Sequence, residues 1–212
     1  LFYKKISKMK NRELCLFRYF YPVTEEKIRA LLQAGIDLNS VNNRGETIFH
    51  RVVNPRNYHD ITSGDPIEND LTFAILNGFN CNLLDCYNNS VFHHSEYTEN
   101  SIICAIEYGN FDINTKNILN RTILHTNKKY SEEFIIKLID DYGFDFRAID
   151  NDGVSIFHFN YLPKVLKHVL DKYPDTEHLL SDKDIDYGRT IFHYCPEYML
   201  HVDNPNINAV DN

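Results

Sequence analysis

Histidine recurs at one position of a repeated phrase, and histidine side chains can serve catalysis or bind metals. The five phrases end at His50, His93, His125, His158 and His193. Their separations are 43, 32, 33 and 35 residues, so each repeat unit contributes one such histidine. Units of a helical array lie about 10 Å apart, whereas the ligands of a zinc ion lie about 2 Å from the metal. We therefore expect these side chains to hydrogen-bond within the fold instead of sharing a metal.

A second candidate site combines two cysteines with the two histidines that follow them. Its members are Cys81, Cys86, His93 and His94. The spacing is similar to that of some zinc sites, but His93 belongs to the repeated phrase and is committed to a turn. Because too few ligands are left, the sequence predicts no metal here.

A third candidate pairs His193 with Cys195, which could form a thiol nucleophile and its base. Catalytic Cys and His usually meet across a fold, and Pro196 interrupts the local geometry here. The sequence also lacks a glycine-rich phosphate-binding loop and a distinct pair of carboxylates. We therefore predict no catalytic residue, no metal and no cofactor.

The repeated histidine closes a six-residue phrase whose chemistry is constant. The copies are Gly45–His50, Asn88–His93, Asn120–His125, Gly153–His158 and Gly188–His193. The first residue is always Gly or Asn, which enter positive φ most easily, so a tight turn is predicted there. The third is always Thr or Ser, whose hydroxyl can cap the following helix. Two apolar residues, expected in the core, precede the histidine.

A second phrase alternates with the first along the chain. Its copies are Gly35–Asn39, Gly78–Asn82, Asn110–Asn114, Gly143–Arg147 and Pro205–Asn208. Apolar residues at helical spacing precede these copies, for example Ile28, Leu31 and Leu32, with Thr24 as the predicted N-cap. Each unit is thus predicted to contain an outer helix that ends at the second phrase.

Two alternating phrases with a period near 33 residues resemble the ankyrin repeat. The resemblance implies an all-α solenoid of about five helix-turn-helix repeats with projecting turns, plus a partial N-terminal unit. It also implies that the histidine orients the turn, and that partners bind at the turn tips and the concave inner-helix face. Larger residues replace the alanines that usually follow the histidine, so we expect irregular inner helices.

We expect a single ankyrin-repeat domain over residues 1–212. The predicted segments are a partial unit 14–41, repeats 42–84, 85–115, 116–148 and 149–183, and a compressed repeat with the start of the next at 184–212. Residues 54–70 contain two prolines and many polar residues, which predicts an inserted loop. The chain stops where another repeat would begin, so we expect a piece of a larger protein.

Composition narrows the classes of partner and the compartment. A net charge of −8 argues against nucleic acid, and the sequence holds no apolar run long enough to cross a membrane. Five irregularly spaced cysteines favour reduced thiols in a cytoplasmic setting. The Asn-, Ile- and Tyr-rich composition resembles ankyrin proteins of intracellular-bacterial effectors and large DNA viruses, which act in host cytosol. We expect a monomer.

The predicted tips supply the candidate binding residues. Tyr87, Ile118 and Leu119 place apolar groups where exposure brings no stability, a pattern that marks interfaces. Further contacts are expected from Arg44, Arg121, Tyr187 and Arg189. The competing interpretation is that the 54–70 loop covers the apolar tips or that skewed repeats bury them.

These observations favour a protein-protein interaction module without chemistry of its own. One alternative is the substrate-recognition or regulatory region of an enzyme whose catalytic domain lies outside residues 1–212. Another is an enzyme site built by the 54–70 loop, which would require a perturbed acid or base in a nearby pocket.

Overall fold

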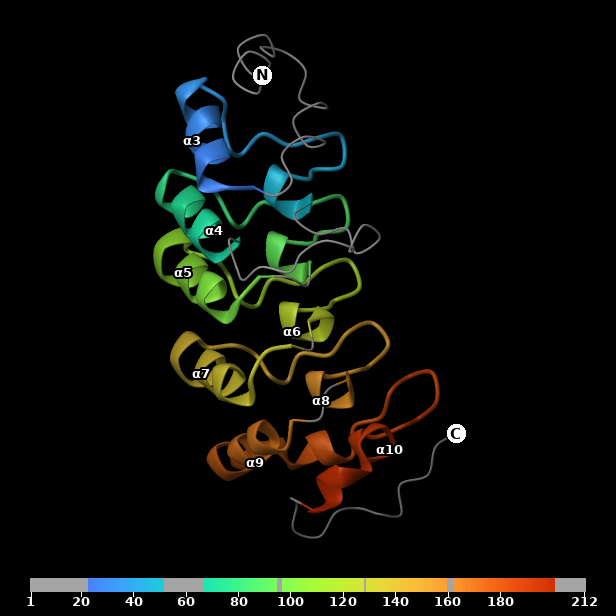
Figure 1. The fold of residues 1–212 in the computed structure, drawn as a ribbon. Helices are drawn as coiled ribbons and strands as arrows, with labels where there is room; N and C mark the ends of the chain where they lie inside the picture. Colours follow the sequence, from blue (N-terminus) through green and yellow to red (C-terminus); the bar gives the residue numbers. More distant parts are fainter. Residues whose placement is uncertain (1–22, 52–66, 95–96, 128, 160–161, 201–212) are drawn as a thin grey trace, which may run out of the picture. The chain divides into compact units, whose positions relative to one another are not determined.

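The computed structural model describes residues 23–51, 67–94, 97–127, 129–159 and 162–200 of the chain. The chain folds into two compact units, unit 1 (Leu1–Asp112) and unit 2 (Ile113–Asn212). Within each unit, longer outer helices stack on one another and shorter inner helices stack beside them (Figure 1). The single domain over 1–212 and its repeat boundaries stay predictions. Residues 14–22 of the predicted partial unit and the second-phrase copy Pro205–Asn208 lie outside the described residues.

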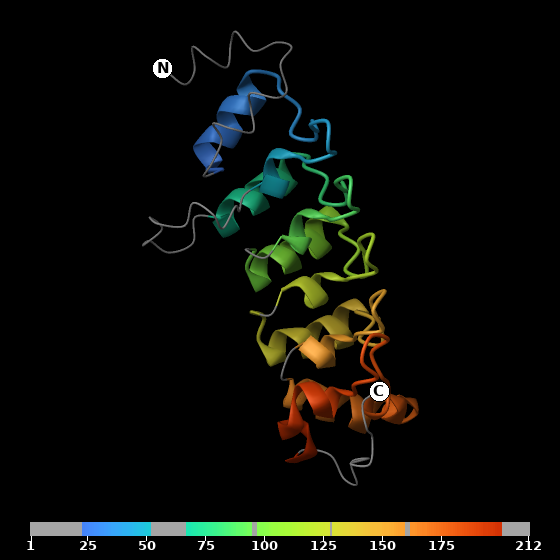
Figure 2. The same ribbon diagram turned by 90° about the vertical axis from the view of Figure 1, so that its right-hand side faces the viewer.

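The described part of unit 1 is built from outer helices joined by short inner turns. The outer helices are α3 (Glu25–Gln33), α4 (Ile67–Leu76) and α5 (Glu99–Gly109). The inner elements are the 3₁₀ turns η2 (Ile48–Arg51) and η4 (Val91–His93). Helix α4 packs against both α3 and α5, and η2 packs against η4. Figure 2 shows the connecting loops of this unit on one side of its helices.

Helix α3 begins and ends as its sequence predicts. The Thr24 hydroxyl accepts the N–H of Lys27 at 3.4 Å, and Gly35 follows the helix with φ of +69°. Ile28 and Leu31 are buried, so the predicted apolar stripe does face the core. The predicted N-cap and helix end are confirmed.

Helix α4 begins at Ile67, so the last four residues of the segment predicted as a loop are helical. A contact with the neighbouring helix holds this first turn in place: the Asp70 carboxylate accepts the N–H of Glu25 at 2.7 Å. An anion at that point caps the N-terminus of α3 from the neighbouring helix. Burial raises the pKa of the Asp70 carboxyl. Residues 54–66 of the predicted loop lie outside the described residues.

The two phrases meet in the core of unit 1. Phe49 of the first phrase packs on Phe79 of the second, with ring centroids 4.2 Å apart, and Phe92 packs on Phe111 at 4.6 Å. The hydroxyl of buried Tyr97 donates to the carbonyl oxygen of Phe49 at 2.8 Å. Each first phrase is thus joined to the second phrase that follows it through aromatic contact.

Unit 2 repeats this plan with different element lengths. Its described elements are α6 (Ile123–Thr126), α7 (Glu132–Tyr142), α8 (Ile156–Phe159), α9 (Pro163–Lys172), η5 (Pro174–Leu180), α10 (Ile191–Tyr194) and η6 (Pro196–Leu200). Helix α7 packs on α9, and α8 packs on both α6 and α10. Ser131 caps α7, because its hydroxyl accepts the N–H of Phe134 at 3.2 Å.

The inner helices are single turns, which confirms the predicted irregularity. Helices α6, α8 and α10 each span four residues. In the fifth repeat the outer helix is reduced to the 3₁₀ turn η6. The hydroxyl of Tyr198, which is fully buried, accepts the N–H of Leu162 at 2.6 Å and anchors this turn to the start of α9.

Helices account for the secondary structure of the described residues, where the only extended pairing is an isolated bridge between Ile149 and Ser155. The predicted all-α class is therefore confirmed. None of the described helices is long and apolar enough to cross a membrane.

Candidate protein interface

The tip loops take their shape from one Asn or Asp side chain in each loop. We call the loops tips 1 to 5, at residues 42–46, 85–89, 117–121, 150–154 and 184–189, and their first residues are Asn42, Asp85, Asn117, Asp150 and Asp184. In tip 4, Asp150 Oδ1 accepts the N–H groups of Asp152 at 2.9 Å and Val154 at 3.0 Å. Equivalent pairs of bonds form in the other tips. Such Asx turns fix the loop without using its outward side chains.

The first residue of each repeated phrase lies in the left-handed region, as predicted. The values of φ are +73° at Gly45, +57° at Asn88, +56° at Asn120, +74° at Gly153 and +66° at Gly188. At Gly45 a Cβ atom would also lie 2.9 Å from the carbonyl oxygen of Leu84. Glycine is therefore required there by both conformation and space.

Tip 5 is one residue longer than the other described tips. Asp184 Oδ1 accepts the N–H groups of Tyr187 and Arg189, three and five residues later, instead of two and four. The additional residue moves Ile185 into the position that contacts the preceding tip. Alignment on the histidine alone did not reveal this insertion.

Every repeated histidine closes a capping arrangement with its own Thr or Ser. In the third repeat the N–H of Thr122 donates to His125 Nδ1 at 3.2 Å, and the Thr122 hydroxyl lies 2.8 Å from the same atom. The same bonds form at Thr47–His50, Ser90–His93, Ser155–His158 and Thr190–His193. Histidine thus fills the capping-box position where Glu or Gln is usual.

Two of these rings, those of His50 and His125, also join neighbouring repeats. Because Nδ1 accepts a backbone N–H, the ring proton of the neutral histidine lies on Nε2. His50 Nε2 donates to the carbonyl oxygen of Asn89 and His125 Nε2 to that of Val154, both at 3.1 Å. Burial lowers the pKa of His50, His125 and His158, which keeps these rings neutral. The predicted structural role of the repeated histidines is confirmed.

Adjacent tips also contact each other through the backbone. In unit 1 the N–H of Cys86 donates to the carbonyl oxygen of Arg44 at 2.7 Å. In unit 2 the N–H of Asn151 donates to the carbonyl oxygen of Leu119 at 3.0 Å. The N–H of Ile185 donates to the backbone carbonyl oxygen of Asp152 at 2.9 Å. These bonds hold each tip at a fixed position beside its neighbour.

Asparagine side chains form a second ladder where the outer helices end. Asn39 Nδ2 donates to the carbonyl oxygen of Gly78 at 2.9 Å, and Asn39 Oδ1 accepts the N–H of Asn80 at 2.8 Å. Asn82 and Asn114 make the same two bonds to the following repeat of their own units. Arg147 occupies this place in the fourth repeat, and its guanidinium instead lies 4.5 Å from the Phe146 ring centroid.

Three of the tips have Asp in place of Asn, and each buried carboxylate has a side-chain donor nearby. Asp85 faces His94, with Nε2 and Oδ2 3.7 Å apart. Asp184 Oδ2 accepts the hydroxyl of Tyr194 at 2.6 Å. Burial opposes the charge on both carboxyls, but hydrogen bonds, including those from tip N–H groups, hold their pKa values below the ordinary value.

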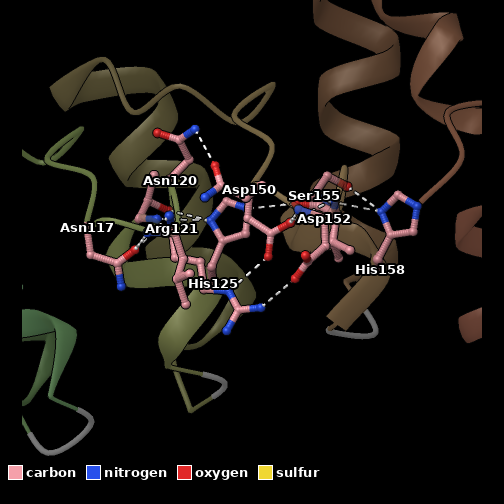
Figure 3. Close-up of polar contacts among 12 residues, drawn as sticks. Asn117, Asn120, Arg121, His125, Asp150, Asp152, Ser155 and His158 are labelled. Atoms are coloured by element: carbon pink, nitrogen blue, oxygen red, sulfur yellow. Dashed lines mark hydrogen bonds and ion pairs between the residues drawn. The ribbon is translucent and has the colours of Figure 1, made fainter. Parts of the chain in front are cut away.

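The carboxylate of tip 4 receives the strongest donor. Arg121 Nε lies 2.8 Å from Asp150 Oδ2, whose side chain is completely buried, and Arg121 Nη2 lies 3.2 Å from Asp152 Oδ2 (Figure 3). Asn120 Nδ2 donates to Asn151 Oδ1 at 2.7 Å in the same group. Arg121, predicted as a partner contact, therefore also joins tip 3 to tip 4.

The apolar residues predicted for binding are exposed on the tips. The exposed fractions are 54% for Tyr87, 51% for Ile118, 44% for Leu119 and 54% for Tyr187. Ile185 is 68% exposed beside Tyr187 and was missed, because the insertion in tip 5 is not visible from the spacing of the histidines. The repeats therefore do not bury these side chains. The other competing interpretation, cover by the 54–70 loop, rests on residues 54–66, which lie outside the described residues.

The structure distributes the predicted residues over both units. Arg44 and Tyr87 occupy adjacent tips of unit 1, and Arg44 is exposed. In unit 2, Ile118 and Leu119 share tip 3 with Arg121. Tyr187 and Arg189 share tip 5, where the Arg189 guanidinium lies 4.3 Å from the Tyr187 ring centroid.

The candidate chemical sites lie in surroundings that serve the fold. Cys81 is buried, which raises the pKa of its thiol to about 11, whereas Cys86 is exposed on tip 2. His193 Nδ1 accepts the N–H of Thr190 at 3.1 Å. Across the described ranges, no group of three or more His, Cys, Asp or Glu residues could hold a metal ion.

The Asn or Asp acceptors of the tips are the structural residues that sequence reasoning missed. The signal was present, because an Asn or Asp stands three residues before the Gly or Asn of the first four phrases. The donors to their buried carboxylates carry a weaker signal. Arg121 comes from the preceding tip, whereas His94 and Tyr194 directly follow a repeated histidine.

Comparison with known proteins identifies the fold. No family model and no curated protein sequence matches the chain. The crystal structure of EF0377, described as an ankyrin repeat protein, is 17% identical over 82% of this chain and 87% of that chain, with a TM-score of 0.55. The ankyrin repeat domain of Bcl-3, described as a unique member of the IkappaB protein family, is 17% identical over 82% and 74%, with a TM-score of 0.50. The chain has the ankyrin-repeat fold, as its phrases predicted.

Proposed function

We propose that this chain is a non-catalytic protein-binding module that holds a partner protein through its tips and the concave face of its inner helices. The observation that carries the proposal is the exposure of Tyr87, Ile118, Leu119 and Tyr187 on tips. The tip backbones are held by Asx turns, capping histidines and neighbouring tips, so their conformation does not depend on these side chains. Exposed apolar groups on a rigid support are typical of interfaces.

The residue types also suit binding. Tyr and Arg are enriched among the residues that dominate binding energy, and Tyr187 with Arg189 forms a stacked pair of this kind. Ile118 and Leu119 add an aliphatic contact, and Arg44 and Arg121 add polar ones. The net charge of −8 supports a protein partner over nucleic acid.

The absence of chemistry is part of the proposal. Three repeated histidines have pKa values lowered by burial, and Cys81 has its thiol pKa raised by burial, so none is poised as a general base or nucleophile at neutral pH. We propose a monomer acting in the cytoplasm, where its thiols stay reduced. If the chain is the recognition region of a larger enzyme, the same tips would select the substrate.

The test is affinity capture from eukaryotic cytosolic lysate, followed by direct titration of the purified captured protein. The binding variant is Tyr87→Ala with Leu119→Asp. The matched control is Tyr108→Ala with Leu76→Asp, since both side chains are exposed on outer helices, at 64% and 63%. We expect the binding variant to weaken affinity at least about tenfold, as for loss of interface anchors, and the control to bind like the wild type.

Three results would contradict the proposal or a part of it. Equal affinities of the wild type and the folded binding variant would remove the tips from the interface. A loss in the control variant alone would move the interface to the outer helices. Sedimentation of the free chain as a dimer would contradict the proposed monomer.

A further inference from the structure

The buried carboxylates of the tips differ in the chemistry of their donors. Asp150 faces the Arg121 guanidinium, and Asp184 faces the Tyr194 phenol, a neutral donor whose pKa burial raises above its ordinary value. Asp85 faces His94, whose imidazole gains a positive charge and a second N–H donor when it takes up a proton. Imidazoles also act on the other two carboxylates, His125 on Asp150 and His158 on Asp184, but burial lowers the pKa of both rings. The pair in tip 2 is the one among these three in which the facing donor itself is a histidine.

The geometry around His94 is that of an incomplete contact. Its Nε2 atom is buried without a hydrogen-bond partner and lies 3.7 Å from Asp85 Oδ2, too far for a good hydrogen bond. Asp85 Oδ2 accepts Asn89 Nδ2 at 3.1 Å, and a carboxylate oxygen can accept a second donor. The His94 side chain as a whole is 32% exposed, so protons reach the ring from solvent. The His50 ring packs edge-on against it at a centroid distance of 6.0 Å. The carboxylates of Asp85 and Glu46 favour a charged His50, but burial is the larger influence and lowers the His50 pKa.

We infer that His94 is a positioning residue that closes on Asp85 when it gains a proton, and so makes tip 2 responsive to pH. The charge converts a loose contact into a charge-assisted hydrogen bond. Asp85 Oδ1 accepts the N–H groups of Tyr87 and Asn89, both at 2.8 Å, so the closed pair holds the backbone that presents Tyr87. Tip 2 is therefore held more tightly in mild acid.

The neighbouring ring directs the proton to His94. His50 Nδ1 accepts the N–H of Thr47, and this bond is lost if Nδ1 is protonated. Two charged imidazoles at this separation would also repel each other. His50 consequently stays neutral and keeps its Nε2 bond to Asn89 while His94 carries the charge.

The consequence for partner binding rests on the proposed function, but the closure of protonated His94 on Asp85 does not. If Tyr87 contacts the partner, the affinity for the partner is expected to be higher at pH of about 5.5 than at pH of about 7.5. The local effect on tip 2 is measurable in the chain alone. Failure of the pH device and failure of partner binding are therefore separate results.

Amide hydrogen exchange of the whole chain, followed by NMR at pH 7.5 and 5.5, tests the inference. Protection factors of the Tyr87 and Asn89 amides are divided by those of Tyr187 and Arg189 in tip 5, whose Tyr194 donor does not titrate in this range. We expect the ratio to rise about fivefold or more on acidification, the size of a charge-assisted bond. A constant ratio in the wild type would overturn the inference.

Two variants make the test specific. In His94→Gln, which cannot take up the charge, the ratio should stay constant. In Asp85→Asn the carboxylate is lost, but the tip should keep its shape because Asn performs the same role at Asn42 and Asn117. The ratio should again be constant. A rise that persists in either folded variant would assign the pH response to other groups and overturn the role of His94.

Discussion

His125 bonds its own repeat through one ring nitrogen and the next repeat through the other. Its Nδ1 atom accepts the N–H of Thr122 at 3.2 Å, and its Nε2 atom donates to the carbonyl oxygen of Val154 at 3.1 Å. A neutral imidazole is the side chain that supplies one acceptor and one donor in opposite directions. The ring therefore links a helix cap to the neighbouring tip, and removing it affects two repeats.

Replacing His125 with Phe is expected to destabilise the chain by about 2–3 kcal/mol, because one buried donor and one buried acceptor lose their partner. Urea unfolding measures this free energy. His178→Ala is the control, since His178 is half-exposed and makes a local contact with the carbonyl oxygen of Asp175. A change in the His125 variant no larger than in the control would contradict the linking role.

Stability is expected to fall as the pH is lowered from about 7 toward 5, the range below the ordinary histidine pKa. Burial lowers the pKa of His50, His125 and His158 in the folded chain, so the unfolded chain binds more protons in this range. The free energy of unfolding is therefore complete above the unfolded pKa and decreases below it.

Urea midpoints at several pH values check this dependence. The His125→Phe variant should show a shallower slope, because one of the titrating groups is absent. A midpoint that stays constant down to pH of about 4, where carboxylates begin to titrate, would contradict the expectation.

Arg121→Met is expected to cost about 1–3 kcal/mol, because it leaves the buried Asp150 carboxylate without its cation. Asp150→Asn should be tolerated better, since Asn occupies the equivalent position of tips 1 and 3. The double variant should then be more stable than Arg121→Met alone. Denaturant unfolding of the four chains forms a double-mutant cycle, and strictly additive changes would contradict the pairing.

Glu132→Ala is expected to cost about 1 kcal/mol by removing the N-terminal cap of α9. Helix α9 starts after Leu162, which offers no side-chain cap. Glu132 supplies one from the neighbouring helix by accepting the N–H groups of Lys164 at 2.6 Å and Val165 at 3.2 Å. Thermal unfolding compares it with Glu133→Ala, which removes an exposed ion pair and should change little. Equal effects of the two changes would contradict the capping role.

The short-range features of this structure were predictable from the sequence. The positive φ of Asn88, the N-cap of Ser131 and the capping role of His125 each depend on groups within a few residues of one another. Short phrases therefore carry them directly, and their repetition every 33 residues or so gave the fold. The Asx acceptors carried an equally local signal, which the emphasis on the histidines left unused.

The contacts between repeats were decided by the tertiary structure. Asp70 caps α3 from 45 residues away, and Arg121 meets Asp150 from 29 residues away. Such pairs depend on the exact stacking of one repeat on the next, and on insertions such as the additional residue of tip 5. The sequence by itself determined the repeated unit, because its bonds are local. Only the folded stack decided which donors serve the buried carboxylates and which side chains the tips leave exposed.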